Sequence, residues 1–274
     1  MPSSKSLKEV VKVAEEITEI SEKKFQSVLT QLKRSFVIMK KDLKIYYNKP
    51  PVIIQGIIFP VILFIALTVG RSVEPIYMIS GLMAMIIFLS STSIGPIVFP
   101  WETMRKTFER LITCPISIKT ILLGSVWSTF IYGLIFSSLP LIFGAIFLSA
   151  ELTINILIVL LGMIVAGLAF ACFSLILSVP SIDSPGNTMV LTVLIKFPLV
   201  FMSPMFMPIS LSPVAYISPI TYFLDIVNVG LGDVSAFGVF GVLIDLGVLV
   251  CFGFVFLILA FLLHGKTLER RFRG

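Results

Sequence analysis

Apolar residues fill long stretches of this chain, and charged residues separate those stretches. Five stretches with at most one charge each are about 20 residues or longer, which is the length an α-helix needs to cross the hydrocarbon of a bilayer. The connections at 71–75 and 149–151 are short, so the helices on either side should form hairpins. The pattern predicts membrane-spanning helices over residues 52–70, 76–100, 120–148, 152–179 and 237–263.

Residues 188–224 form a further stretch that is almost uncharged and interrupted by prolines. Each proline removes a backbone donor and disfavours helix in the residue before it. One span here keeps both basic ends of the chain on one side, whereas two spans would place Lys266 and the arginines after it outside. We expect one span at about 188–207 and a broken, re-entrant segment at 208–224, which needs protein or water around its backbone. The prolines are at positions 198, 204, 208, 213 and 219.

The N-terminal region has a different pattern. Residues 4–49 contain no Gly or Pro, and their apolar positions recur every three or four residues, as in an amphipathic helix. Residues 27–46 carry lysines and are expected to lie at the headgroups beside anionic lipid. The alternative is a solvated helix that merely leads into the membrane. The predicted organisation is a cytosolic helical extension at 1–25 with no assigned role, an amphipathic interfacial helix at 26–50, a six-span domain at 51–265 and a basic cytosolic tail at 266–274.

Composition narrows the class of protein. Hydrophobic residues make up 57% of the chain and charged residues only 13%, against about 25% in soluble domains. This balance excludes a soluble enzyme, a disordered chain and a disulfide scaffold. Cys114, Cys172 and Cys251 form no metal-binding spacing, and His264 is the only histidine, so a multi-histidine metal or haem site within one chain is excluded. The fold class is an all-α membrane protein.

The net charge of +6 is concentrated at membrane edges. Of the 21 Lys and Arg residues, 11 lie in residues 1–50, four in 101–119 and four in 264–274. Basic clusters beside apolar spans mark the cytoplasmic side, so both termini are expected there, with no role in binding nucleic acid. The first 30 residues lack the apolar run of a secretory signal peptide. We expect a multi-pass protein of the cell membrane.

Residues 260–267, AFLLHGKT, match a permissive nucleotide P-loop pattern. A P-loop needs a strand before it and a helix after it, so that backbone amides surround the phosphates. Here an apolar span precedes the motif and only seven residues follow it. We therefore expect no catalytic residues, no cofactor in this chain and no ATP hydrolysis by it.

The stretch between the second and third spans, 101–124, has a charged first half and an apolar second half that Pro115 interrupts. A plain loop would be polar throughout, whereas a short helix on the membrane surface has this pattern. It would offer charged side chains to a cytosolic partner, namely Glu102, Arg105, Lys106, Glu109 and Arg110.

This stretch resembles the cytoplasmic segment of ABC-2-type transporter permeases, the membrane subunits of many ABC exporters. It departs from the usual pattern at Lys106, where that family has Gly, and at Phe108, where it has Leu. The matching positions are Thr107, Glu109, Leu111, Pro115, Ser117 and Gly124.

Two further stretches carry the same resemblance. Residues 40–50, KKDLKIYYNKP, are similar to the start of the family's first span, with Pro60 following. In residues 197–225 the usual later Arg is absent, and Asn228 lies near its place. The similar positions in that stretch are Ser203, Pro208, Pro213, Pro219 and Tyr222.

The resemblance implies a division of labour between chains. Two six-span subunits, identical or similar, would form the pore, and two cytosolic ATPase subunits holding ATP and Mg would dock below. Residues 101–114 would be the coupling helix, and 208–224 would help to close an extracellular gate. The transported lipid, drug, polysaccharide or ion is left open.

Lys196 and Asp245 are the charges that lie deep within predicted spans, where a charge costs at least about 2.5–3.5 kcal/mol and often has a partner. Their expected depths differ by only about 6 Å, so an ion pair is one reading. In the other, Lys196 extends alone toward the inner interface and Asp245 faces a helix neighbour. A secondary transporter driven by ions or protons through these two residues is the alternative function, although no internal repeat is evident. An intramembrane hydrolase is a weaker rival, because His264 lies at the inner edge.

Overall fold

The computed structural model describes residues 29–70, 73–114, 116–147, 155–179, 185–205 and 213–273, and no strand occurs among them. The first described helix covers residues 29–46 and is called the N-terminal helix here. The elements that follow are α2 (Pro50–Ile53), the π-helix η1 (Ile54–Ile58), α3 (Phe59–Thr68), α4 (Pro75–Ser91), α5 (Gly95–Met104), α6 (Thr107–Ile112), α7 (Ile118–Phe147), α8 (Ile156–Leu177), α9 (Pro185–Met202), the 3₁₀-helix η3 (Pro213–Ile217), α10 (Pro219–Gly230) and α11 (Gly241–Arg273).

Five helical segments are long and apolar enough to cross a membrane, and they lie where the sequence pattern predicts spans. Helix α9 lies where the additional span at 188–207 is expected. Its apolar part, Asn187–Met202, is shorter than the five segments. The predicted basic tail is not a separate segment, because α11 continues through it to Arg273. The five segments are Pro50–Thr68, Pro75–Met104, Ile118–Gly144, Ile156–Leu177 and Gly241–Lys266.

The first span contains one turn of π-helix. Pro60 has no backbone N–H and cannot make the usual bond to the residue four positions earlier. The turn before it widens, and the Phe59 N–H donates to the carbonyl of Ile54, five residues back. A π-turn of this kind keeps the helix continuous past a proline, and such turns are frequent at functional sites.

The second span is the most buried, and it breaks between α4 and α5. Pro96 is the second residue of α5, and hydroxyl groups satisfy carbonyls near the break. Thr92 Oγ1 donates to Phe88 O at 2.6 Å, and Ser93 Oγ donates to Ser90 O at 2.8 Å. Gly95 permits close packing on α8, since a Cβ there would lie 2.9 Å from the carbonyl oxygen of Ser174. The interior of the bundle is therefore polar at this level.

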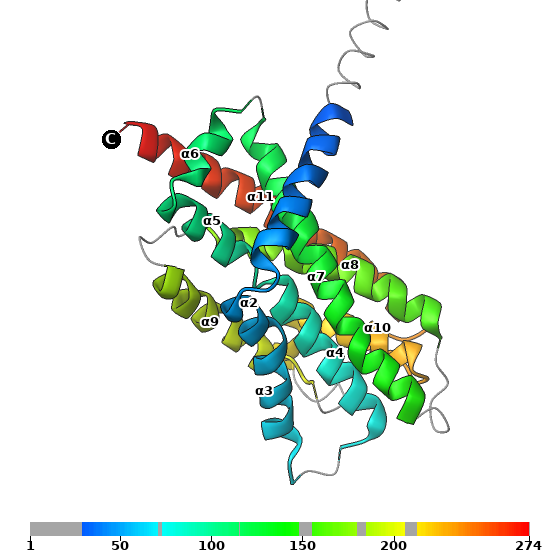
Figure 1. Cartoon of the computed structure of the whole chain (residues 1–274). Helices are drawn as coiled ribbons and strands as arrows, with labels where there is room; N and C mark the ends of the chain where they lie inside the picture. The colour runs from blue at the N-terminus through cyan, green and yellow to red at the C-terminus, as the bar shows by residue number, and fades with distance from the viewer. Residues whose placement is uncertain are drawn as a thin grey trace, which may run out of the picture.

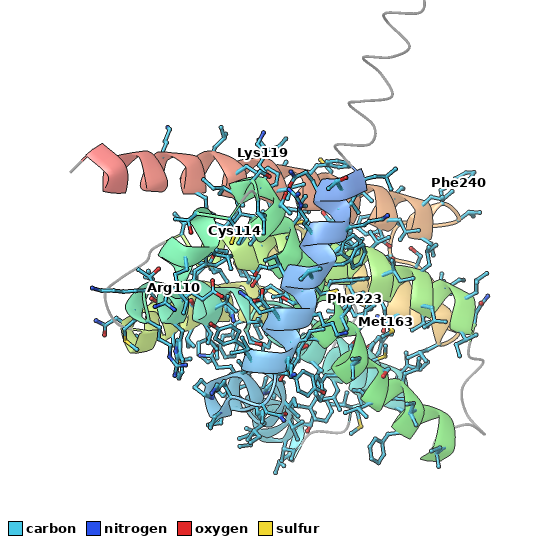
Figure 2. The ribbon with its side chains drawn as sticks, turned by 45° about the horizontal axis from the view of Figure 1, so that its top comes forward. Arg110, Cys114, Lys119, Met163, Phe223 and Phe240 are labelled. Atoms are coloured by element: carbon cyan, nitrogen blue, oxygen red, sulfur yellow. The ribbon has the colours of Figure 1, made fainter. Side chains whose placement is uncertain are left out.

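The helices pack around a core in which α4 and α8 are central. Phe88 and Phe170 meet edge to face, with ring centroids 5.1 Å apart. Met163 and Phe223, labelled in Figure 2, belong to the same buried cluster. Most side chains of α11 and of the first span face outward and are apolar, as expected for surfaces in contact with lipid.

The loops gather at two opposite ends of the bundle (Figure 1). At one end Tyr77 Oη donates to Asp233 at 3.1 Å, and the Asn155 N–H donates to Gly230 O at 2.7 Å. At the other end the N-terminal helix, α6 and the end of α11 lie together. Tyr77 and Asp233 therefore lie at one end of the bundle, and the described basic segments lie at the other.

The stretch predicted to be re-entrant is a broken helix in its described part. Helix η3 ends at Ile217, and α10 begins at Pro219, where a missing N–H is tolerated. Ser218 Oγ donates to Leu199 O at 3.0 Å and ties the break to α9. With 12 residues, α10 is roughly 18 Å long, too short to cross about 30 Å of hydrocarbon.

Candidate functional site

The N-terminal helix packs across the start of α7. Gly124 allows this contact, since a Cβ there would lie 2.6 Å from Cβ of Ile38 and 2.8 Å from the carbonyl oxygen of Ser35. Phe36 stacks on Trp127, with centroids 5.5 Å apart. The predicted amphipathic helix is thus present, and one of its faces is attached to the bundle.

A cluster of charges joins this helix to the end of α5. Lys41 Nζ donates to Glu102 Oε1 and forms an ion pair with Asp42 at 3.0 Å. Asp42 and Glu102 are both almost fully buried. The other carboxylate oxygen of Glu102 has no hydrogen-bond partner in the part of the chain that the structure describes. Lys41 therefore contacts both buried carboxylates.

Burial changes how these groups titrate. It raises the pKa of Asp42 to about 7, and the attraction of Lys41 only partly opposes that rise. Burial lowers the pKa of Lys41, but the combined attraction of Asp42 and Glu102 is larger, so its net pKa is raised. The ammonium form is favoured by its neighbours, which fits its role as the single cation of the cluster.

Trp101, at the start of the predicted coupling segment, contacts two basic side chains. The guanidinium carbon of Arg105 lies 5.0 Å from the centre of a Trp101 ring, and Nζ of Lys49 lies 5.7 Å from it. Cation–π contacts of this kind fix the direction of the two basic side chains. Thr107 Oγ1 donates to the Glu102 carbonyl at 3.2 Å and connects α6 to α5.

Lys106, between α5 and α6, has a φ of +56°. This left-handed conformation is costly for a residue with a Cβ and free for glycine. The backbone here thus has a geometry that suits glycine, the residue that the family resembled by this chain has at the position of Lys106.

We expect Lys106→Gly to be about 1–2 kcal/mol more stable than Lys106→Val, since a β-branched residue tolerates this geometry worst. The measurement is the midpoint of thermal unfolding in a neutral detergent. The wild type should lie between the two variants. Equal midpoints for all three would contradict a left-handed residue at this position.

Exposed basic residues lie just before α6 and on it, and in Figure 2 Arg110, Cys114 and Lys119 lie away from Phe240. Arg105, Lys106 and Arg110 are exposed. The prediction that Glu102 faces a cytosolic partner is wrong. Its side chain is only 4% exposed and points to Lys41. Thr107 is exposed, whereas the side chain of Glu109 and all of Pro115 lie outside the described residues.

The residues predicted for an outer gate are only partly described. Tyr222 Oη donates to Tyr216 O at 2.9 Å, so α10 folds back on η3, and its ring stacks on Phe237 at 5.8 Å. Ser203 is buried, and its hydroxyl has no hydrogen-bond partner among the residues that the structure describes. Pro219 begins α10, Pro213 begins η3, and Pro208 lies outside the described residues.

Lys196 and Asp245 do not form the ion pair that depth alone allowed. Lys196 lines a cavity with residues of η1 and α3, whereas Asp245 faces α10. The Asp245 carboxyl lies against the carboxyl of Asp225, and no other hydrogen-bond partner is found for it among the described residues. The estimate failed because equal depth says nothing about which face of the bundle a residue occupies.

Asp225 on α10 is a functional candidate that the sequence pattern did not single out. It is 1% exposed and lies within electrostatic range of Asp245. Its carboxylate accepts hydrogen bonds from Ser235 Oγ at 2.6 Å and from the Ala236 N–H at 3.0 Å. Asp225 follows the proline-rich stretch directly, beside a predicted loop, so nothing in the sequence indicated that it is buried.

We expect Lys196→Met and Asp245→Leu each to raise thermal stability by about 1–3 kcal/mol, because the first removes a buried ammonium with no ion pair among the described residues and the second removes one of two adjacent buried carboxyls. The double variant should show the sum to within about 0.5 kcal/mol, as for sites that do not touch. Unfolding midpoints of the four proteins in neutral detergent provide the measurement. Lower unfolding midpoints in both single variants, with partial recovery in the double variant, would show instead that Lys196 and Asp245 form an ion pair.

The P-loop-like stretch is part of a continuous helix, α11. His264 Nε2 lies 3.1 Å from both Ser178 Oγ and Leu175 O, so it attaches α11 to the end of α8. Its buried ring also lies beside Phe99. The histidine therefore has a structural position among polar groups of the chain itself.

Comparison with known proteins agrees with this arrangement of helices. The family model of ABC-2 type transporters matches residues 28–232, well over half of the chain, from the N-terminal helix through α10. No curated protein matches the chain. Transport permeases make up this family, and the match includes the segment around Trp101 and the broken helix at α10. The chain is a multi-pass membrane protein and belongs to the ABC-2 type transporter family.

Proposed function

We propose that the chain is the membrane subunit of an ATP-driven exporter and that a separate cytosolic ATPase, holding ATP and Mg, docks on the surface of α6. The observation that carries this proposal is the exposed basic surface of Arg105, Lys106 and Arg110 at the end where the basic segments gather. Because the P-loop-like stretch of this sequence lacks the strand before it that a phosphate-binding loop needs, ATP would be hydrolysed in another chain. A second copy, or a similar permease, completes the pore.

The coupling route follows the contacts around Trp101. A movement of α6 caused by the ATPase would be transmitted to Glu102 through the Thr107 hydrogen bond and the short α5–α6 connection. From Glu102 it passes through Lys41 to the N-terminal helix, and along α5 to the break near Thr92. The ends of helices commonly act as hinges, so the break between α4 and α5 is where α5 would move relative to α4.

The outer gate in this proposal is the broken segment of η3 and α10, at the end opposite α6. Its attachment to α9 through Ser218 supports a closed state, and Tyr222 holds α10 against η3. Lipid, drug, polysaccharide and ion are the candidate cargoes. The alternative of a secondary transporter driven through Lys196 and Asp245 loses its main support, because the two residues face different neighbours.

Both termini are proposed to be cytoplasmic, with six spans. We expect single cysteines at Glu74, Glu151 and Asp233 to react with an impermeant reagent from outside, and those at Ser4 and Asp183 to be protected. The background should lack Cys114, Cys172 and Cys251. External labelling at position 4, or protection at 233, would contradict the orientation.

Copurification tests the proposed function. The chain should be co-expressed with an ABC ATPase encoded beside it and purified through a tag on the permease alone. We expect the ATPase to copurify in equal amount and its hydrolysis to depend on the permease. Reconstituted transport that needs an ion gradient but no ATP would support the secondary transporter instead.

A further inference from the structure

A cavity of about 220 Å³ lies between the first span and α9. Its polar lining residues are Lys196 and Gln55, and its other walls are apolar side chains of η1, α3, α4 and α9. Phe59 and Phe197 meet edge to face at 5.4 Å and join α3 to α9 beside it. The cavity thus combines an apolar wall with one cation and one amide.

The Lys196 ammonium is the unusual feature of this cavity. The side chain is 3% exposed, and no ion pair or hydrogen bond of its ammonium is found among the described residues. It lies 11 residues after the start of α9, or roughly 16 Å along the helix axis. A lysine in that position is unfavourable unless water or an anion accompanies it.

The π-turn places the second polar group in the cavity. Ile54 and Gln55 are the first residues of η1 and both line the cavity. Gln55 is half-buried, and no side-chain hydrogen bond of its amide is found in the described part of the chain. Two donors without partners therefore face one apolar cavity from two different spans, which is the arrangement of a site rather than of packing.

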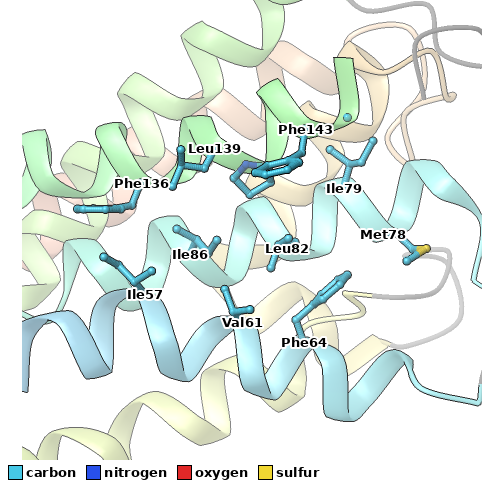
Figure 3. Close-up of a pocket in the computed structure, with 12 residues that line it drawn as sticks. Ile57, Val61, Phe64, Met78, Ile79, Leu82, Ile86, Phe136, Leu139 and Phe143 are labelled. Atoms are coloured by element: carbon cyan, nitrogen blue, oxygen red, sulfur yellow. The ribbon is translucent and has the colours of Figure 1, made fainter. Parts of the chain in front are cut away.

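A second cavity has no charged residue in its lining, so the Lys196 ammonium is not a general feature of cavities in this bundle. It has a volume of about 370 Å³ and lies between α3, α4 and α7 (Figure 3). All of its lining residues are apolar, among them Val61, Leu82 and Phe136. This larger cavity offers nothing to an anion and serves as the internal comparison.

We propose that the Lys196 cavity binds an anionic amphiphile, with its phosphate or carboxylate oxygens at Lys196 and Gln55 and its alkyl chain along the apolar wall. Drug-sized pockets are about 300–1,000 Å³, so this cavity holds the headgroup and the first part of one chain. Ile54 is half exposed at the cavity and lets the chain continue along the outside of the bundle. An anionic bilayer lipid and an anionic single-chain cargo share this chemistry.

The test uses the purified full chain in a neutral maltoside detergent, with dodecyl phosphate as the probe. We expect saturable thermal stabilisation of the wild type. Lys196→Met should weaken the apparent affinity by at least about tenfold, as for loss of a charge-assisted hydrogen bond, and Lys196→Arg should retain it. Leu194→Met is the matched control, because Leu194 is exposed on the same helix.

Further arms separate the sources of the ligand. Inorganic phosphate alone should not stabilise the protein, because the alkyl chain is required. Stabilisation in nanodiscs containing phosphatidylglycerol, lost in Lys196→Met, would identify a bilayer lipid, and its absence there would identify a single-chain ligand. Equal affinity of wild type and Lys196→Met, or equal effects of dodecyl phosphate and an uncharged dodecyl ether, would overturn the proposal.

Whether the bound amphiphile is the cargo rests on the proposed function, whereas its binding does not. The binding assay needs no ATPase, so failure of binding and failure of ATPase docking are separate results. A change from dimer to monomer in Lys196→Met without any loss of binding would assign this face to a second copy of the chain and would also overturn the proposal.

Discussion

Replacing Lys41 with Met should destabilise the protein by about 2 kcal/mol and disconnect the N-terminal helix from α5. The variant leaves the carboxylates of Asp42 and Glu102 buried without their cation. Breaking a fully buried pair costs about 3–5 kcal/mol, and the loss here is smaller because Lys41 is 26% exposed. The measurement is the unfolding midpoint in neutral detergent.

Glu102→Gln combined with Lys41→Met should recover part of that loss, since fewer unpaired charges remain. Lys44→Met is the control, because Lys44 is an exposed lysine of the same helix. It should change the midpoint by no more than about 0.5 kcal/mol. If Lys41→Met and Lys44→Met behave alike, the charge cluster does not hold the helix in place.

Arg110→Glu should weaken binding of the ATPase by at least about tenfold, because it reverses a charge on the proposed docking surface of α6. Arg110 is exposed, so folding and membrane insertion should be unchanged. The amount of ATPase that copurifies with the tagged permease, titrated against ATPase concentration, gives the affinity.

Lys119→Glu is the matched control for this experiment, since it makes the same charge change at another exposed site near the same end of the molecule. It should retain wild-type affinity to within about twofold. Equal losses in both variants would indicate attraction by general positive charge. Wild-type affinity in Arg110→Glu would remove α6 from the interface.

Hydrophobic length located the spans because the hydrocarbon core requires about 20 apolar residues per helix. Lys106 shows what such a pattern misses, since its left-handed φ depends on how α5 meets α6. The inward turn of Glu102 likewise follows from packing of the N-terminal helix, about 60 residues earlier in the chain. Contacts between distant segments are set by packing, and local patterns do not contain them.

The intramembrane charges illustrate the same limit. Depth along a helix follows from counting residues, but the direction in which a side chain faces depends on the neighbouring helices. Asp245 faces Asp225, and Lys196 faces the first span. The break between η3 and α10 fits the broken helix expected from the prolines of 208–224, because the effect of proline on a helix is local.

Site-specific crosslinking tests the central claim, docking of an ATPase on α6, most directly. Thr113 is exposed after α6, and Val239, at 99% exposure, lies in the loop before α11 at the opposite end. With a photoreactive benzoylphenylalanine placed at each position in turn, membranes that contain the co-expressed ATPase are irradiated. We predict a permease–ATPase adduct from position 113 and none from position 239. An adduct from position 239, or none from position 113 in a complex that copurifies intact, would contradict the account.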